Sequence, residues 1–222
     1  MTATTGNIGS APAAPSMTRF YLSLDAVRNA GDKLLTGVHA VGSLPGGGAA
    51  TTTLSVTVPS SMPIGSYHLL ACADDQKHVA ETSETNNCMP APSTVNVSRA
   101  DLVVQTTGVV GPTTVARGGV ITASDNTRNQ GLVTAGPSST RYYLSLDAVK
   151  SSSDKPLTGS RAVAGLLTGA ASQGSAQVTV PLDTTPGTYY LVACADASSA
   201  ITELSETNNC TASASPAVTV TP

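Results

Sequence analysis

Hydrophobic residues recur at alternate positions along this chain, a spacing typical of half-buried β-strands, and no segment shows helical periodicity. In the second half, short runs rich in branched and aromatic residues are separated by Gly, Pro, Asn and Asp, which favour turns. Strands are predicted there at 101–107, 119–128, 138–146, near 161–163, 175–181, 188–196 and 217–221. Seven or so short strands without helices predict an all-β sandwich.

The same pattern occurs twice. Residues 19–27 read RFYLSLDAV, and residues 141–149 read RYYLSLDAV. Aligning 7–97 with 129–219 without a gap gives 43 identical positions out of 91. The chain is therefore expected to hold two copies of one domain. In the first copy, the corresponding strands are predicted near 17–24, 38–42, 53–59, 66–73 and 94–98.

The two copies are not equally complete. In the alignment Met1 lies opposite Ala123, so the first copy lacks the strand equivalent to 101–107, the turn at 113–119 and most of the second strand. Missing strands would leave a sheet edge and part of the core uncovered. The prediction is therefore an incomplete sandwich at 1–98 followed by a complete one at 99–222.

Composition excludes several classes of protein. The net charge is −3, and 11 Lys and Arg residues spread along the chain do not form the basic stripe that nucleic-acid binding needs. No run of about 18 apolar residues is present, so no membrane insertion is expected. The first residues lack the features of a signal peptide, so any such signal is expected outside this chain. No nucleophile and base recur together, and no enzymatic activity is expected.

The four cysteines form two pairs with the same spacing. Free thiols or a metal site are alternatives, but there is no CxxC motif and the second copy has no histidine. Disulfides are therefore predicted at Cys72–Cys88 and Cys194–Cys210. Each would close a loop of about 15 residues and add on the order of 3 kcal/mol of stability. Disulfides indicate an oxidising compartment, extracellular or at the cell surface.

Polar residues between the paired cysteines repeat at equivalent positions. They are Glu81, Glu84, Asn86 and Asn87 in the first copy, and Glu203, Glu206, Asn208 and Asn209 in the second. Side chains of this kind stabilise irregular loops by hydrogen bonding to the backbone, and this is their predicted role. Contact with a ligand or an ion is the alternative.

A second repeated set consists of aspartates in a loop between two strands, namely Asp25 and Asp32 with Asp147 and Asp154. Converging carboxylates could hold Ca²⁺ through oxygen ligands. Aspartates also favour turns because their side chains cap the backbone, and the spacing lacks the dense acidic pattern of a strong calcium site. Calcium is the single cofactor candidate, and otherwise none is expected.

These motifs resemble the bacterial cell-adhesion-related domain, CARDB. The resemblance lies in the YLSLD strand at 143–147, the PGTYYLVACAD strand at 186–196 and the ELSETNNC loop at 203–210. The first copy matches from Asn7 onward, but its missing start departs from the family pattern. The resemblance implies immunoglobulin-like β-sandwiches, usually in tandem on secreted or surface proteins of prokaryotes, without catalytic activity.

The expected function is a non-catalytic, extracellular structural or adhesion repeat, the unit of a surface fibre or adhesin stalk. The missing strands could lie upstream in a longer array, come from a second chain, or be absent with partial packing against a neighbour. The expected partners are therefore other copies or neighbouring repeats at the open edge of the first domain. The alternative is an accessory module that positions substrate or glycan for a secreted enzyme, which the absence of Trp disfavours.

Replacing Cys194 by Ser should markedly lower the melting temperature under oxidising conditions, because the loop up to Cys210 would no longer be closed in the unfolded chain. Circular dichroism during heating would measure the effect. An unchanged melting temperature would contradict the predicted disulfide.

Overall fold

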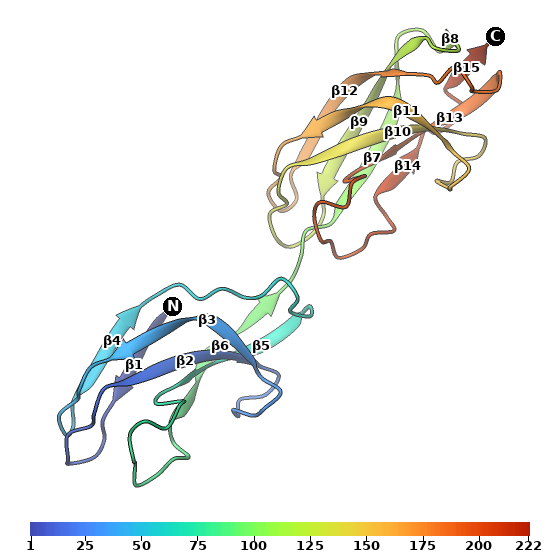
Figure 1. Ribbon diagram of the computed structural model, residues 1–222. Coiled ribbons are helices and arrows are strands. Elements are labelled where there is room, and N and C mark those ends of the chain that lie inside the picture. Colours follow the sequence, from blue (N-terminus) through green and yellow to red (C-terminus); the bar gives the residue numbers. More distant parts are fainter. The chain divides into compact units, whose positions relative to one another are not determined.

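The computed structural model describes all 222 residues, and they form strands, turns and loops but no helix (Figure 1). No helix that could span a membrane is present. Two compact units, residues 1–97 and 98–222, divide between Val97 and Ser98, and they are called unit 1 and unit 2. The division lies one residue before the boundary predicted from the repeat.

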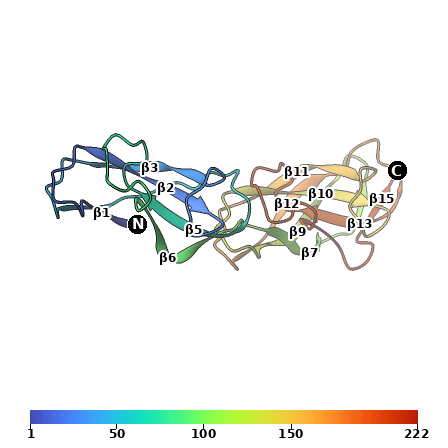
Figure 2. The ribbon, with the colours of Figure 1, turned by 90° about the horizontal axis from the view of Figure 1, so that it is seen from below.

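Unit 2 is a β-sandwich with a complete set of strands. One layer has the order β7 (Leu102–Val110), β9 (Val120–Asn129), β12 (Ala171–Thr179). The other has β11 (Lys155–Val163), β10 (Ser138–Ser145) and β13 (Gly187–Cys194), with β14 (Cys210–Ala212) and β15 (Val218–Thr221) both paired to β13. A single bridge between Thr158 and Thr179 connects the layers. Figure 2 shows β7 and β9 side by side within this unit.

The turn predicted at 113–119 contains a short strand, β8 (Thr114–Ala116), which pairs in parallel with β15. Sequence alternation misses it because the strand has three residues and only Val115 is buried. Strand β7 forms the edge of its layer beside β9, and β8 extends the other layer beyond β15. Leu102, Val104 and Val115 all belong to the main hydrophobic core of the unit.

Unit 1 repeats this strand order but lacks counterparts of β7 and β8. Its larger sheet has the order β3 (Lys33–Val41), β2 (Ser16–Ser23), β5 (Gly65–Cys72), β6 (Cys88–Val97). Its smaller sheet contains β1 (Thr2–Gly6) and β4 (Ala49–Thr53). Strand β1 corresponds to the second half of β9, so one edge of β1 has no neighbouring strand.

Strand β4 ends at Thr53, although the alternating pattern predicts a strand at 53–59. In unit 2 the equivalent residues continue β12 because they pair with residues 120–124 of β9. Unit 1 has almost no counterpart of that stretch, so beyond Leu54 only an isolated bridge between Thr36 and Thr57 remains. The sequence pattern for a strand is present, but its hydrogen-bonding partner is not.

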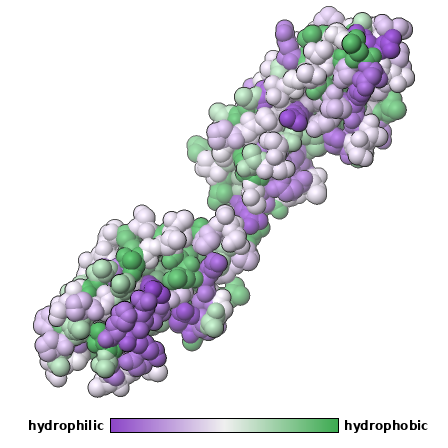
Figure 3. Space-filling view, viewed as in Figure 1, coloured by the Kyte–Doolittle hydropathy of each residue, from purple (hydrophilic) through white to green (hydrophobic).

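The core of unit 1 is consequently less buried than that of unit 2. Three valines of unit 2 are fully buried at 0 % exposure, namely Val178, Val180 and Val218. Val56 and Val58, the counterparts of Val178 and Val180, are only half-buried, and so is Val95, which pairs with Tyr67 as Val218 pairs with Tyr189. Apolar side chains reach the surface on the faces of both units seen in Figure 3. The segments that would cover the half-buried valines are the ones that unit 1 lacks.

Candidate functional site

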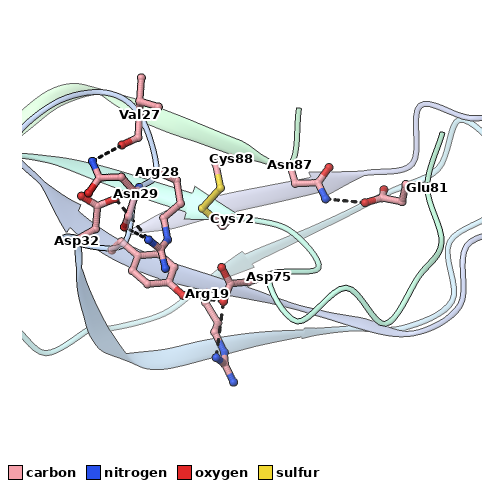
Figure 4. Close-up of a disulfide and its surroundings, with 11 residues drawn as sticks. Arg19, Val27, Arg28, Asn29, Asp32, Cys72, Asp75, Glu81, Asn87 and Cys88 are labelled. Atoms are coloured by element: carbon pink, nitrogen blue, oxygen red, sulfur yellow. Dashed lines mark hydrogen bonds and ion pairs between the residues drawn. A yellow bond between two sulfur atoms is a disulfide. The ribbon is translucent and has the colours of Figure 1, made fainter. Parts of the chain in front are cut away.

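Both predicted disulfides are present, and each joins the ends of two paired strands. Cys72 of β5 bonds to Cys88 of β6 (Figure 4), and Cys194 of β13 bonds to Cys210 of β14. The Cα atoms of each pair are 4.0 Å apart and lie opposite each other in the ladder. Residues 73–87 and 195–209 therefore form loops closed at their base, called here the closed loops of units 1 and 2.

Each closed loop begins with an aspartate in the left-handed region, Asp74 with φ of 41° or Asp196 with φ of 39°. The Asp74 carboxylate accepts hydrogen bonds from the backbone N–H groups of His78 and Val79, at 3.0 and 2.8 Å. The Asp196 carboxylate likewise accepts from the N–H of Ile201, five residues after it, at 2.8 Å. Sequence reasoning missed this role, although the Ala-Cys-Ala-Asp repeat contains both residues.

In unit 2 the closed loop holds the beginning of β7. The Glu203 carboxylate accepts hydrogen bonds from the backbone N–H of Leu102 at 3.0 Å and from Asn209 Nδ2 at 2.6 Å. Asn208 Nδ2 donates to Asp101 Oδ1 at 3.0 Å, and Ala100 forms a parallel bridge with Glu203. The repeated acidic and amide residues therefore connect two parts of the chain that are distant in sequence.

Glu203 is 3 % exposed, and burial raises its pKa to about 7 from an ordinary value near 4.5. The negative charges of Glu206 and Asp196 raise it further, whereas the hydrogen bonds from Asn209 and Leu102 lower it. The folded unit consequently binds a proton at this carboxyl that the unfolded chain releases between pH 4.5 and about 7.

The closed loop of unit 1 keeps its internal bonds but contacts no first strand. Glu81 accepts from Asn87 Nδ2 at 2.6 Å (Figure 4), and Glu84 accepts from the Glu81 N–H at 3.3 Å. Glu81 and Asn86 are exposed, in contrast to the buried Glu203. The loop has the conformation that holds β7 in unit 2, without a β7.

The four aspartates considered as calcium ligands all accept backbone hydrogen bonds in turns. Asp25 accepts from the Val27 N–H at 2.9 Å, and Asp32 accepts from the Asn29 N–H at 2.7 Å. Asp147 and Asp154 repeat both bonds, at 2.9 and 2.7 Å. No group of three or more His, Cys, Asp or Glu side chains that could hold a metal ion is found. The geometry favours the turn-stabilising role, and calcium binding stays a prediction.

A cation lies beside each of these loops. Arg28 is 3.7 Å from Asp32 and stacks over the Tyr21 ring, 3.8 Å from its centroid (Figure 4). Lys150 takes the same place in unit 2, 4.2 Å from the centroid of the Tyr143 ring. The carboxylates of Asp32 and Asp154 thus have a positive neighbour already. The pair of charges and the ring hold the loop against its strand.

Unit 2 also contains a buried ion pair that sequence reasoning missed. Asp125 accepts from Arg161 Nε at 2.8 Å and Nη2 at 2.5 Å, from the Tyr142 hydroxyl at 2.5 Å and from Thr127 Oγ1 at 2.8 Å. Burial alone would raise the pKa of Asp125, but these hydrogen bonds outweigh it, so the pKa lies below its ordinary value. Burial and the hydrogen bond to Asp125 raise the pKa of Tyr142.

Unit 1 replaces the charged members of this cluster together. Ala3, Phe20 and His39 stand where unit 2 has Asp125, Tyr142 and Arg161. The buried hydrogen bond between two threonine hydroxyls remains in both units, at 2.6 Å for Thr5 with Thr18 and 3.0 Å for Thr127 with Thr140. An ion pair lost as a whole leaves no buried charge without a partner, so both versions of the site can be stable.

A family model described as CARDB matches residues 1–91 and 99–213, which together make up most of the chain. The chain belongs to the CARDB family. Its two CARDB units are thus adhesion-related or structural domains of a non-catalytic family. A search of curated proteins found no match.

Several solved structures are similar to the chain. A crystal structure of a CARDB domain from Pyrococcus furiosus, described as in complex with di-metal ions, is 20 % identical, with 57 % of this chain and 97 % of that chain covered and a TM-score of 0.36. A solution NMR structure of a CARDB domain from the same organism is 18 % identical, with 56 % and 97 % covered and a TM-score of 0.36. Red sea bream transglutaminase is 12 % identical, with 100 % of this chain but 28 % of that chain covered and a TM-score of 0.32.

Replacing Asp125 by Ala should destabilise unit 2 by about 3–5 kcal/mol, because the buried Arg161 guanidinium would lose its counter-charge. The triple variant Asp125→Ala, Tyr142→Phe, Arg161→His copies unit 1 and should recover most of that loss. Urea unfolding followed by circular dichroism would measure both free energies. A triple variant as unstable as the single variant would contradict the coupling of these residues.

Replacing Glu203 by Gln should remove one pH dependence of stability. The raised pKa means that Glu203 stabilises unit 2 fully below pH 4.5, and that this contribution is lost as the pH rises to about 7. Gln does not titrate, so the difference in melting temperature between variant and wild type should change in this window and stay constant above it. The unfolding transition of unit 2 is identified as the one whose melting temperature Cys194→Ser lowers. A difference in this melting temperature between Glu203→Gln and the wild type that stays the same at every pH would contradict the raised pKa of Glu203.

Proposed function

We propose that this protein is a non-catalytic, extracellular structural or adhesion repeat, in which unit 1 is completed by a strand from a neighbouring repeat or subunit. The observation that carries the proposal is the open side of unit 1, where β1 and β6 have no neighbouring strand in place of β7 and β8. Unpaired strand edges bind other strands readily, because their N–H and C=O groups need partners.

The composition of each unit supports this role. Both units are small sandwiches with a disulfide at the base of a long loop, and disulfides persist in oxidising compartments. The repeated residues with assigned contacts act within the fold, and none of them forms a nucleophile and base pair. Such units are suited to repetition along a fibre or stalk.

The proposal is tested by measuring assembly of the purified chain. Sedimentation velocity at increasing concentration, with negative-stain microscopy, should detect association through the unpaired edges of β1 and β6 in unit 1, and uniform fibres where these edges of successive chains pair. The control is an extended variant in which residues 99–122 are repeated directly before Met1. That addition supplies unit 1 with its missing strands at the register of the repeat, and the variant should stay a monomer.

A wild-type chain that stays a monomer at every concentration would contradict the proposal. If that monomer also bound to a glycan array, the protein would instead be an accessory module of a larger secreted enzyme.

A further inference from the structure

We propose that unit 1 contains a preformed binding slot for one kind of extended segment, supplied from outside residues 1–222, with the chemistry of residues 100–104 (ADLVV). The segment has a small residue, then Asp, then aliphatic residues whose side chains cover the core. This inference rests on the proposed function and deepens it, because it names the ligand and the groups that bind it. Its basis is that unit 2 already holds such a segment, while unit 1 keeps the contact groups and lacks the segment.

The first contact group is an asparagine at the end of a strand, Asn129 in β9 of unit 2 and Asn7 directly after β1 in unit 1. In unit 2, Asn129 Oδ1 accepts hydrogen bonds from the N–H of Gly131 at 3.0 Å and from the N–H of Asp101 at 3.1 Å. Asn7 takes the same position in unit 1 and accepts from the equivalent glycine, Gly9, at 3.0 Å. The second acceptor position of Asn7 Oδ1, which corresponds to the Asp101 N–H, is free.

The amide nitrogen of this asparagine fixes its orientation. Asn129 Nδ2 donates to the carbonyls of Val133 and Leu166, at 2.8 and 3.0 Å. Asn7 Nδ2 donates to the equivalent carbonyls of Ala11 and Leu44, at 2.8 and 3.1 Å. The Asn7 oxygen is therefore held toward the place where the segment lies in unit 2, although unit 1 has no segment there.

The second feature is a glycine that leaves room for a passing backbone. A Cβ atom on Gly131 would lie 2.5 Å from the carbonyl carbon of Ala100 and the nitrogen of Asp101, so the segment of unit 2 passes directly over this glycine. Gly9 is its counterpart, and a Cβ atom there would meet only Asn7 Oδ1, at 3.2 Å. Unit 1 thus keeps the space for the crossing without anything that fills it.

The third feature is the closed loop of unit 1. Glu203 receives the Leu102 N–H on one carboxylate oxygen and Asn209 on the other. Glu81 keeps the bond to Asn87 on one oxygen, at 2.6 Å, and its other oxygen is left for the N–H of an incoming residue. Asn86 corresponds to Asn208, which binds the carboxylate of Asp101, so Asn86 is placed to select an acidic residue in the ligand.

The fourth feature is the exposed part of the core. In unit 2, Leu102 and Val104 are 0 and 2 % exposed and pack into the hydrophobic core. The start of β7 lies over β13, where Leu191 and Ala193 are 0 % exposed, and their counterparts in unit 1, Leu69 and Ala71, are only half-buried. Aliphatic side chains of a bound segment would bury Leu69 and Ala71, which favours Leu and Val over polar residues in the ligand.

The occupant comes from outside residues 1–222, from a neighbouring repeat or another subunit, because the one such segment within these residues is already bound by unit 2. Leu102 to Gly108 pair with Asn129 to Ser124 of β9 there, and Asp101 is held by two further side chains. Moving this segment to unit 1 would open unit 2 to the same extent. Two positions differ between the slots, since Ile8 and Met89 replace Gln130 and Thr211, which bind Asp101 and Val104 by side-chain hydrogen bonds. Selection of the acidic residue in unit 1 therefore depends on Asn86.

The experiment uses a fluorescein-labelled peptide with the sequence of residues 99–110, titrated with the full chain at concentrations where the chain is a monomer. Fluorescence anisotropy should show saturable binding, and a peptide with Ala in place of its Asp should bind roughly tenfold more weakly, as expected for a lost charge-assisted hydrogen bond. Asn86→Ala should weaken binding of the parent peptide by a similar factor. Asn86 is exposed and makes no hydrogen bond within unit 1, so this variant should fold normally.

The matched control is Asn208→Ala, the same substitution in the slot that is already filled, which should leave peptide affinity unchanged. Amide NMR shifts on binding should lie at residues 2–9 and 81–87. No binding by the wild type, binding unaffected by Asn86→Ala, or shifts confined to unit 2 would each overturn the inference. If the peptide binds but the chain never assembles, the binding slot is supported and the fibre proposal is contradicted. If the chain assembles but does not bind the peptide, the fibre proposal is supported and the slot is contradicted.

Discussion

The first strand of a complete CARDB unit lies between two parts of the chain that are far apart in sequence. In unit 2, β9 supplies a ladder of backbone hydrogen bonds to one edge of β7, and the closed loop that ends at Cys210 holds the start of β7 through Glu203 and Asn208. The closed loop of unit 1 has the same internal hydrogen bonds without such a strand, so the strand is not needed to hold these side chains in place. Where the strand is present the core is fully buried, and where it is absent part of the core stays exposed.

The two units also show how a buried polar cluster can change without loss of the fold. The threonine pair, Thr127 with Thr140 or Thr5 with Thr18, is neutral and is kept in both. The charged pair beside it is present in unit 2 and replaced as a set in unit 1, where His39 Nδ1 is buried without a hydrogen-bond partner. A neutral pair satisfies itself, but a buried charge requires its opposite, so only the charged residues must change together.

Much of the fold could be predicted from the sequence because alternation, turn residues and the internal repeat are local or pairwise signals. The strands 188–196 and 138–146 and both disulfides are of this kind. The early end of β4 at Thr53 could not be predicted from its own residues, because it depends on a partner strand that unit 1 lacks. Nor does a single Asp at position 125 or Arg at position 161 indicate burial, since charged residues at alternate positions normally face solvent. Comparing the two copies would have found this cluster, because Asp125, Tyr142 and Arg161 all have different residues at the equivalent positions of unit 1.

The parallel pairing of β8 with β15 gives unit 2 a mechanical property. Strand β8 follows β7 near the start of the unit's sequence, β15 ends it, and the two run in the same direction, with Thr114 opposite Thr219 and Ala116 opposite Thr221. Tension that reached β8 through β7 would slide β8 and β15 past each other and load their hydrogen bonds together. Unit 1 has no strand beside β6 in this position, and its resistance to tension would have to come from whatever completes it.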